Sequence, residues 1–329
     1  MGAQPRVTVY WYSQTGQLLE SVSAVTDPLE KAGWDVRKVE IRPREPYPFP
    51  WPVRRFFGVF PAAVAPDGAP EITARPPVAD GDDADLVVFA FPVWYLAPAL
   101  PMRGFVDAEP KAFEGRAVVG LVACRNMWYS AAVEVQRLLQ AAGGRYLGTI
   151  AAVDTASAGV TFVTTLRWLL AGKREASWGF PRAGVGTDEL DRLALLGERI
   201  AELAPAQPEL APEQAESASH TVSEDALADR VRDVLAAHDA APVQFPLAAA
   251  DLLAGKAFRV WGRVIRAAGR RGEAQRNVLT GVFVLWLFGA ILTGLPTVVV
   301  ARVLFKAGFD AAVARRLAPV VAGLAEVRR

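Results

Sequence analysis

Cysteine and histidine are nearly absent from this 329-residue chain, and charge is sparse. The single cysteine, Cys124, excludes an intramolecular disulfide, and two histidines leave no His/Cys cluster for a structural zinc site. Charged residues make up only 22% of the chain and hydrophobic residues 52%, a balance that excludes wholesale disorder. A chain of this length and apolar content is long enough for roughly two domains with a sizeable core.

The net charge of +1 conceals an asymmetry along the chain. Residues 256–329 carry 13 basic and 3 acidic side chains, a net of +10, and the remaining 23 basic and 32 acidic side chains leave −9 for residues 1–255. Within the basic part, no charged residue occurs from Asn277 to Ala301. As a helix, the 23-residue segment 278–300 would be ~34 Å long, which is enough to span a hydrocarbon core of ~30 Å.

Basic and apolar residues alternate at three- and four-residue spacing on both sides of this segment, as in helices that lie on anionic membrane surfaces. Gly294 and Pro296 leave open whether the segment spans the bilayer or forms a re-entrant or in-plane hairpin. The first residues lack the pattern of a secretory signal. We therefore expect a cytoplasmic protein anchored to the inner face of the membrane by its C-terminal region, the alternative being a buried core helix.

Alternating strand and helix patterns in residues 6–203 predict an α/β fold with a doubly wound, five-stranded parallel sheet. The strands are expected at 6–12, 34–41, 85–91, 116–123 and 146–153, and helices at 97–107, 127–142 and 187–203, the last capped by Thr187. The segment 43–61, with six prolines and six aromatic residues, is either a surface arm or a lid over an apolar ligand. The segment 154–186 fits neither a strand nor a plain linker.

The predicted organisation has three parts. Residues 1–204 form the α/β domain, and residues 205–220 form a linker rich in proline, alanine and glutamate. Residues 221–329 form a helical, basic, membrane-associated region that includes the hydrophobic segment 278–300. Its first helix begins with Thr221 and Glu224 in a capping-box pattern.

The first candidate site is the sequence Ser13-Gln14-Thr15-Gly16-Gln17-Leu18, which directly follows the first strand and opens a helix. In that position hydroxyls and backbone N–H groups converge on an anion. The loop has neither the Gly-Lys-Ser/Thr of a Walker loop nor a Gly-x-Gly-x-x-Gly pattern. A phosphate bound without a metal or a lysine indicates a nucleotide monophosphate such as FMN, although such turns are also common without a ligand.

Two further loops follow the third and fourth strands, and both carry aromatic residues. In a doubly wound sheet, ligands bind beyond the carboxyl ends of the strands, so these loops and the hydroxyl loop form one predicted site for a planar ring. The predicted FMN-binding residues beyond the first loop are Pro92, Val93, Trp94, Tyr95, Cys124, Arg125, Asn126, Met127 and Trp128. Arg125 is the candidate catalytic residue, because its cation would stabilise negative charge on reduced flavin. Taken separately, Trp94 and Trp128 are typical of core packing.

The succession YSQTG, FPVWYLAPALPMRGFVD and VACRNMW resembles the flavodoxin-like flavoproteins over residues 6–203. The YPFPWPVRRFFGVFP arm, the ACRNMW loop and the basic hydrophobic tail further resemble a bacterial family labelled dialkylresorcinol condensing enzymes, over nearly the whole chain. This resemblance implies a flavodoxin-like fold, FMN, and a part in dialkylresorcinol or aryl-polyene-type lipid biosynthesis, with a ketosynthase as a candidate partner. The chain departs from the flavodoxin pattern at Leu18, where a Thr or Ser hydroxyl is usual.

Thiolase-like condensation needs a nucleophilic cysteine supported by histidines, and no motif places His220 or His238 near Cys124. Oxidation of a cyclic diketone to its aromatic resorcinol asks less of the protein, because the flavin carries the redox step. We therefore predict a membrane-associated, FMN-dependent oxidoreductase acting on a hydrophobic cyclic diketone, resorcinol or quinone-like substrate. The alternatives are an electron-transfer protein for a membrane partner and a flavin-free scaffold of a lipid-synthesis complex. We expect no metal and no nucleic-acid partner, because the basic residues flank an apolar run.

Overall fold

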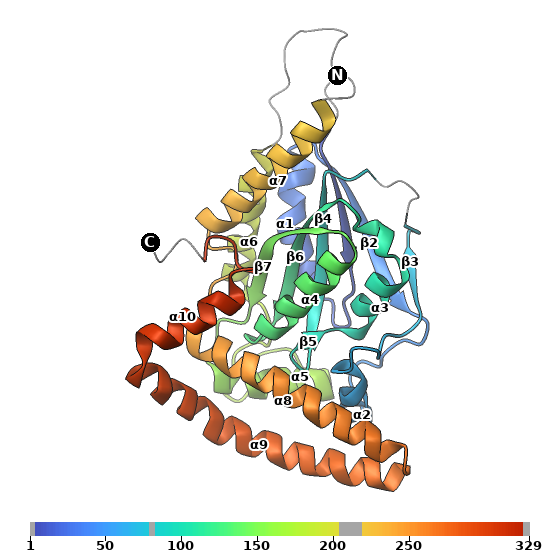
Figure 1. Cartoon of the computed structure of the whole chain (residues 1–329), viewed down its shortest axis with the longest axis vertical. Helices are drawn as coiled ribbons and strands as arrows, with labels where there is room; N and C mark the ends of the chain where they lie inside the picture. Colours follow the sequence, from blue (N-terminus) through green and yellow to red (C-terminus); the bar gives the residue numbers. More distant parts are fainter. Residues whose placement is uncertain (1–3, 79–82, 204–218, 325–329) are drawn as a thin grey trace.

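A sheet of mostly parallel strands with helices on both faces organises the computed structural model of the chain (Figure 1). The structure describes residues 4–78, 83–203 and 219–324. The seven strands in these ranges are β1 (Arg6–Trp11), β2 (Asp35–Pro43), β3 (Ile72–Arg75), β4 (Leu86–Trp94), β5 (Ala97–Pro98), β6 (Ala117–Cys124) and β7 (Arg145–Val153). Their order is β3-β2-β1-β4-β6-β7, with β5 paired to β4.

The predicted doubly wound fold is confirmed, with seven strands rather than five. Strands β2, β1, β4, β6 and β7 pair in parallel, which is the strand order of flavodoxin-like sheets. The first six residues of β4 are all buried, as the continuous apolar run of a central strand predicts. The two additional strands are antiparallel and too short to give a periodic pattern: β3 covers the edge of β2, and β5 folds back on the end of β4.

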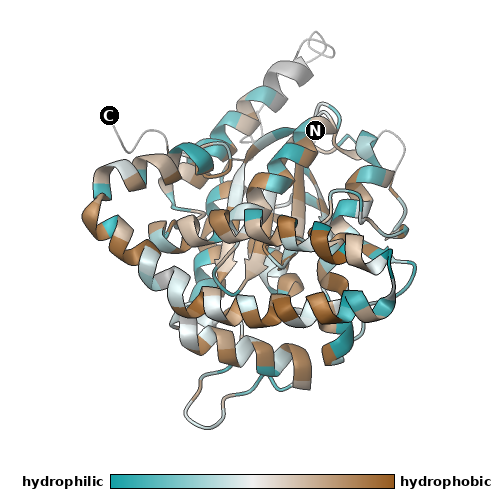
Figure 2. Cartoon of the chain, turned by 60° about the horizontal axis from the view of Figure 1, so that its bottom comes forward, coloured by the Kyte–Doolittle hydropathy of each residue, from teal (hydrophilic) through white to brown (hydrophobic). Residues whose placement is uncertain are grey.

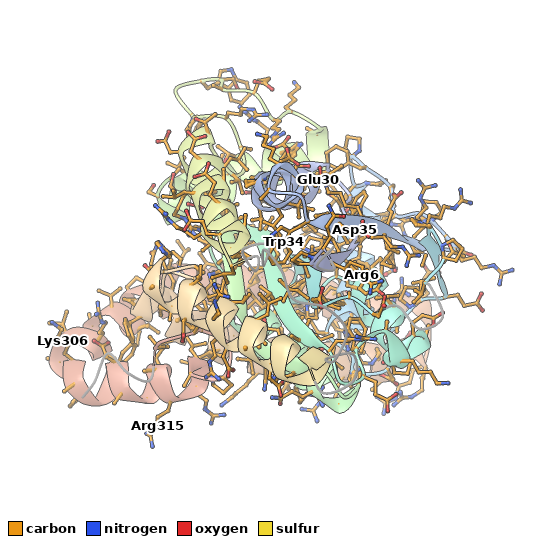
Figure 3. The ribbon with its side chains drawn as sticks, turned by 90° about the horizontal axis from the view of Figure 1, so that it is seen from above. Arg6, Glu30, Trp34, Asp35, Lys306 and Arg315 are labelled. Atoms are coloured by element: carbon orange, nitrogen blue, oxygen red, sulfur yellow. The ribbon has the colours of Figure 1, made fainter. Side chains whose placement is uncertain are left out.

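Helices cover both faces of the sheet. They are α1 (Gln17–Lys31), α2 (Val53–Ala63), α3 (Leu100–Ala108), α4 (Tyr129–Ala141), α5 (Ala158–Ala171), α6 (Thr187–Ala201), α7 (Ser219–Ala237), α8 (Phe245–Gly269), α9 (Glu273–Leu304) and α10 (Lys306–Leu317), with a 3₁₀ turn at Pro110–Ala112. One face buries apolar residues of α1, α6 and α7, and the other buries residues of α3, α4, α8 and α10. At the start of β2, the indole N–H of Trp34 donates to the carbonyl of Ala201 at the end of α6, 3.3 Å away (Figure 3).

Two segments to which the sequence assigned no strand or helix contain helices: α5 lies within 154–186 and α2 within the proline-rich arm. One predicted cap needs correction. Thr187 is the first residue of α6 rather than its cap, because Gly186 holds the N-cap position and no side chain caps the helix. Residues 205–218 of the predicted linker lie outside the described residues, and its last two residues belong to α7, which begins at Ser219. The side chains of 219–224, and with them the predicted capping box of Thr221 and Glu224, lie outside what the structure describes.

The C-terminal helices form a hairpin along the base of the molecule (Figure 1). Helix α9 continues unbroken across Gly294 and Pro296, so this part of the chain makes no re-entrant turn there. Helix α10 then returns to the sheet, where Val313 and Leu317 are buried in the same core as the strands; Lys306 and Arg315 mark its course in Figure 3. Helix α9 is long and apolar enough to cross a membrane, yet only 6% of its most apolar stretch is buried within the protein.

Candidate functional site

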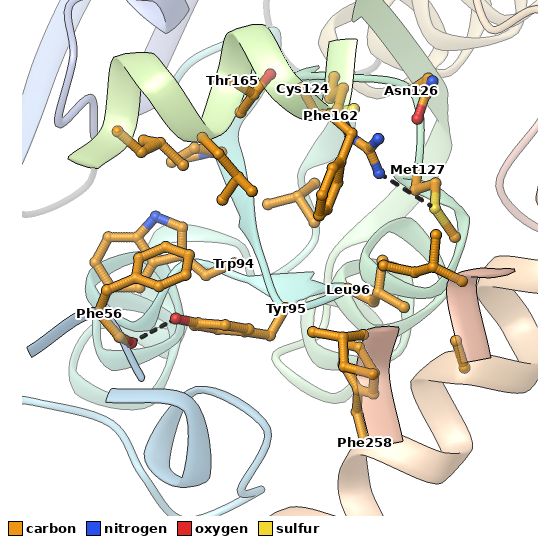
Figure 4. A pocket seen from close by; sticks show the side chains of 18 of the residues that line it. Phe56, Trp94, Tyr95, Leu96, Cys124, Asn126, Met127, Phe162, Thr165 and Phe258 are labelled. Atoms are coloured by element: carbon orange, nitrogen blue, oxygen red, sulfur yellow. Dashed lines mark hydrogen bonds between the residues drawn. The ribbon is translucent and has the colours of Figure 1, made fainter. Parts of the chain in front are cut away.

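A cavity of about 720 Å³ lies at the carboxyl ends of β1, β4 and β6, where a doubly wound sheet changes its winding direction (Figure 4). It is lined by the loops after all three strands and by residues of α2, α5, α8 and α9. The structure therefore brings together the three loops that the sequence singled out. The predicted residues on its wall are Ser13, Gln14, Thr15, Gln17, Leu18, Pro92, Val93, Trp94, Tyr95, Cys124, Arg125, Asn126 and Met127.

One end of the cavity is polar and faces the beginning of α1. Gly16 is the N-cap of α1 and adopts a left-handed conformation (φ +84°), with open space where a side chain would be. The amide nitrogen of Gln17 and the amide oxygen of Asn126 are buried on the cavity wall without a hydrogen-bond partner. Because buried polar atoms are rarely left unpaired, these two atoms mark where a polar ligand would bind.

The proline-rich arm forms a wall of the cavity rather than a detached surface feature. The Gln14 side chain donates to the carbonyl of Pro48 (2.8 Å) and accepts from the indole of Trp51 (3.0 Å). Trp51 is buried and contacts Trp94 edge to face, with ring centroids 5.6 Å apart. Phe56 continues this aromatic wall along α2. The Gln14 side chain therefore connects the arm to the loop before α1 through two hydrogen bonds.

A strained turn presents two more side chains to the cavity. Tyr95 and Leu96 connect β4 to β5 and both have positive φ (52° and 63°), the backbone of a two-residue hairpin turn that normally carries Asn or Gly. Such conformations cost on the order of 1–3 kcal/mol per residue and concentrate at functional sites. The Tyr95 hydroxyl donates to the carbonyl of Phe56 (Figure 4), which fixes the turn against the arm.

Arg125 is the only charged side chain among the described residues that line the cavity. Its guanidinium contacts the sulfur of Met127 (3.7 Å) and lies over the ring of Phe162, 5.5 Å from the centroid. Burial lowers the pKa of Arg125, while the nearby Asp154 carboxylate opposes this shift. An arginine remains protonated under such conditions, so the cavity has one fixed cation in an apolar wall.

Of the neighbouring residues Cys124 and Trp128, only Cys124 lies on the cavity wall as predicted. Cys124 lines the cavity, but burial raises the pKa of its thiol far above the usual range, which disfavours the nucleophilic thiolate. Trp128 is not among the lining residues: it is buried in the core and stacks on Tyr129, with ring centroids 4.4 Å apart. Trp128 therefore packs in the core and does not lie beside the predicted ring site.

The other end of the cavity is an apolar chamber that the sequence analysis did not predict. Helices α5, α8 and α9 supply its walls, including Phe162, Leu253, Trp286 and Ile291. The available signal was that residues 278–300 are apolar all round, which leaves one face of the helix for the protein and another for a membrane. The predicted membrane segment is thus also part of the site.

Helix α8 is hydrogen-bonded to the loop that carries Arg125. The carboxylate of Asp251, on α8, accepts the backbone N–H groups of Tyr129 (3.2 Å) and Ser130 (2.9 Å) at the start of α4. The Ser130 hydroxyl donates to the Asp251 carbonyl at 3.1 Å. Asp251 is fully buried, and burial raises its pKa from 3.8 to about 6 although these hydrogen bonds oppose the shift. The C-terminal hairpin therefore helps to position the loop before α4.

Stability is expected to depend on pH through Asp251. Its pKa is about 6 in the folded chain and near 3.8 when exposed, so the folded state holds this proton more tightly and its contribution to the free energy of unfolding falls as the pH rises between these values. The shift corresponds to about 3 kcal/mol. Relative to Asp251→Asn, which does not titrate, the wild type should lose that amount between about pH 4 and about pH 7 in urea unfolding. A difference that is constant with pH would contradict this assignment.

The strand order and the site at the switch point define a doubly wound α/β protein of the flavodoxin-like class. Among the described residues, no group of three or more His, Cys, Asp or Glu side chains is placed to hold a metal ion. No protein-family model and no curated protein matches the chain.

Solved structures with some similarity include a flavoprotein of Lactobacillus acidophilus NCFM in complex with FMN, which is 16% identical, with 45% of this chain and 93% of that chain covered and a TM-score of 0.37. A protein of Bacteroides uniformis ATCC 8492 assigned as a flavoprotein is 14% identical over 51% of this chain and 99% of that chain, with a TM-score of 0.36. A third protein, from Bacteroides eggerthii DSM 20697 and also assigned as a flavoprotein, is 16% identical over 52% of this chain and 100% of that chain, with a TM-score of 0.35.

Proposed function

We propose that the protein is an FMN-dependent oxidoreductase that acts on a hydrophobic, ring-bearing substrate at a membrane surface. The observation that carries this proposal is the shape of the cavity, which joins a polar loop at the start of α1 to an apolar chamber under α8 and α9. Its volume of about 720 Å³ lies within the range for small-molecule and cofactor sites.

The residues at the polar end fit FMN. Ser13, Thr15 and the first N–H groups of α1 would hold the phosphate, as helix N-termini do for anions. The unpaired amide groups of Gln17 and Asn126 would bind polar atoms of the cofactor, and Trp94 would border its ring system. Leu18 lines the cavity but offers no hydroxyl, and most of its side chain is buried in the core beneath the loop.

The apolar chamber beside the polar loop favours an enzyme over an electron carrier. A carrier of this fold needs only an exposed ring edge for its partner, whereas here Trp51, Phe56 and the chamber provide an apolar wall that could hold a substrate next to the ring. No acidic residue is among the described residues of the lining. A flavin-free scaffold would have no use for a cavity with unpaired polar atoms at one end and an apolar chamber at the other.

Arg125 supports a substrate whose oxygen carries negative charge, such as the enolate of a cyclic diketone. The neutral diketone loses its proton to solvent when the enolate forms, and conversion of the enolate to an aromatic resorcinol then removes a hydride from the ring. Bound FMN supplies the acceptor for the hydride. Arg125 would hold the enolate oxygen, and the apolar wall of Phe162 and Leu253 would exclude water from the reacting carbon atoms.

The resemblance of the arm and tail to the dialkylresorcinol family supports a place in dialkylresorcinol or aryl-polyene-type lipid biosynthesis. Oxidation fits this chain better than condensation, because the buried thiol of Cys124 has a raised pKa and the described His238 is exposed in the turn after α7. A ketosynthase that makes the ring would then supply the substrate, either as a partner or as a separate enzyme.

Helix α9 supports membrane attachment and direct access for an apolar substrate. Its inner side chains Trp286, Leu287 and Ile291 line the cavity, while Leu285 and Leu292 are exposed on its outer side. Both ends of α9 return to the body of the protein through α8 and α10, so the helix lies along the base (Figure 2) rather than projecting from it. We propose that α9 lies in the plane of the membrane surface on the cytoplasmic side.

The purified full-length protein is expected to contain FMN and not FAD. The loop 13–17 is a cradle for one phosphate, and no second loop for a pyrophosphate borders the cavity among the described residues. Acid release of the cofactor followed by chromatography against FMN and FAD standards measures this. Finding FAD, or no flavin after incubation with FMN, would contradict the proposed cofactor.

The proposed activity is tested by anaerobic mixing of the flavin-loaded protein with alkylated cyclohexane-1,3-diones and with quinols. Loss of flavin absorbance, with formation of the matching resorcinol or quinone, is the expected result. A flavin that none of these substrates reduces, but that a reductase partner reduces rapidly, would favour the electron carrier instead.

A further inference from the structure

A second cavity, separate from the flavin site, lies between the end of α2 and the neighbouring face of α8. It has a volume of about 360 Å³. Four of its seven lining residues are cations and the other three are apolar: Val64, Pro66, Lys256, Arg259, Val260, Arg263 and Arg266. We call it the basic groove. No acidic residue is among the described residues that line it.

The cations of the basic groove are not neutralised by neighbouring carboxylates. Lys256, Arg259 and Arg263 are exposed, and no ion pair joins any of the four to another described residue. Arg266 donates to the carbonyl of Pro61, which uses one of its five N–H donors and fixes its direction. Four cations that converge without a counter-charge produce a local positive potential that attracts anions.

The basic groove is continuous with the aromatic cluster that holds α9 in place. Val64 belongs both to the groove and to a core cluster in which Phe60 stacks on Phe283, with ring centroids 4.0 Å apart. Phe258 of α8 packs into the same cluster. The groove is thus linked to α9 through one packed aromatic cluster.

We propose that the basic groove binds the phosphate headgroup of an anionic phospholipid while the outer side of α9 lies among the acyl chains. The apolar residues Val64, Pro66 and Val260 would contact the glycerol and upper acyl part of the same lipid. A soluble anion would bind the cations but would make no contact with these apolar residues. The combination of cations and apolar residues therefore favours a lipid. The inference rests on the proposed membrane attachment and adds a specific headgroup site to it.

Vesicle binding of the full-length protein tests the proposal. Vesicles of phosphatidylcholine alone are compared with vesicles in which about a third of the lipid is phosphatidylglycerol, by flotation over a range of lipid concentrations. Each basic residue near an anionic surface contributes about fivefold in affinity, so Arg259→Gln/Arg263→Gln should bind the anionic vesicles roughly 30-fold more weakly. Lys256→Gln/Arg263→Gln is a second pair that should behave alike.

The matched control is Arg230→Gln/Arg232→Gln, which removes the same charge from exposed positions on α7, at the far end of the molecule (Figure 1). The control should bind both vesicle types as the wild type does. Equal losses in the groove and control variants, equal wild-type binding to both vesicle types, or competition by inorganic phosphate beyond the effect of matched salt would each overturn the headgroup site. Absence of wild-type binding to any vesicle would instead refute membrane attachment itself.

Discussion

Arg125→Ala is expected to lower flavin affinity or turnover by roughly 10- to 100-fold, while Cys124→Ala retains most activity. The guanidinium is the one charge on the described cavity wall, and losing a charge-assisted hydrogen bond to an anionic oxygen costs about 1.5–3 kcal/mol. Cys124 ends strand β6, where a raised thiol pKa indicates packing rather than nucleophilic attack.

These neighbouring positions form a matched pair, since both line the cavity on the same loop and one substitution removes charge while the other removes a small thiol. Flavin titration and kcat/KM on one substrate measure the two effects. Arg125→Lys should recover part of the loss, because lysine restores the positive charge but not the planar set of N–H donors of the guanidinium. If Cys124→Ala abolishes turnover and Arg125→Ala does not, the protein is a condensing enzyme.

Replacing two exposed leucines of α9 is expected to release the protein from membranes. Leu285 and Leu292 are 74% and 75% exposed on the outer side of the helix. Burying a leucine fully stabilises by about 1.5–3 kcal/mol, so Leu285→Ser/Leu292→Ser should weaken vesicle binding by roughly 100-fold or more. Sedimentation with vesicles measures this, and the flavin content should not change.

The control for this variant is Leu19→Ser/Leu195→Ser, which removes two exposed leucines from α1 and α6. It should bind vesicles as the wild type does, because those helices lie on the sheet and not along the base. Unchanged vesicle binding by the α9 variant would mean that another protein surface covers this helix.

The sheet could be predicted because its central strands are buried on both sides. Segments such as DLVVFAF and RAVVGLVA have no polar interruption, and β4 and β6 follow them to within a few residues. The three loops of the site were predicted for the same reason, since parallel strands place their carboxyl ends at one edge.

The chamber could not be predicted, because its residues meet only through packing of distant helices. Phe162 lies in a segment whose apolar residues show no clear helical or strand periodicity. Trp286 lies in an apolar segment whose hydropathy predicts contact with lipid, and this pattern does not reveal that one face of the helix contacts the protein. Trp128 is the opposite case, because the sequence predicts it in the site and the structure places it in the core. It adjoins the site in sequence, but its position at the N-cap of α4 turns it into the core.

The left-handed turn at Tyr95 and Leu96 has a consequence for engineering this protein. Asn-Gly would adopt this turn at little backbone cost, but it would also remove the packing of Tyr95 and Leu96 against the aromatic cluster around Phe60. The same exchange would remove two side chains from the wall of the cavity and the hydroxyl that joins the turn to Phe56. The backbone strain of the turn and the packing of the cavity wall are therefore coupled at one dipeptide, and a variant that relieves the strain would have a wider, less selective site.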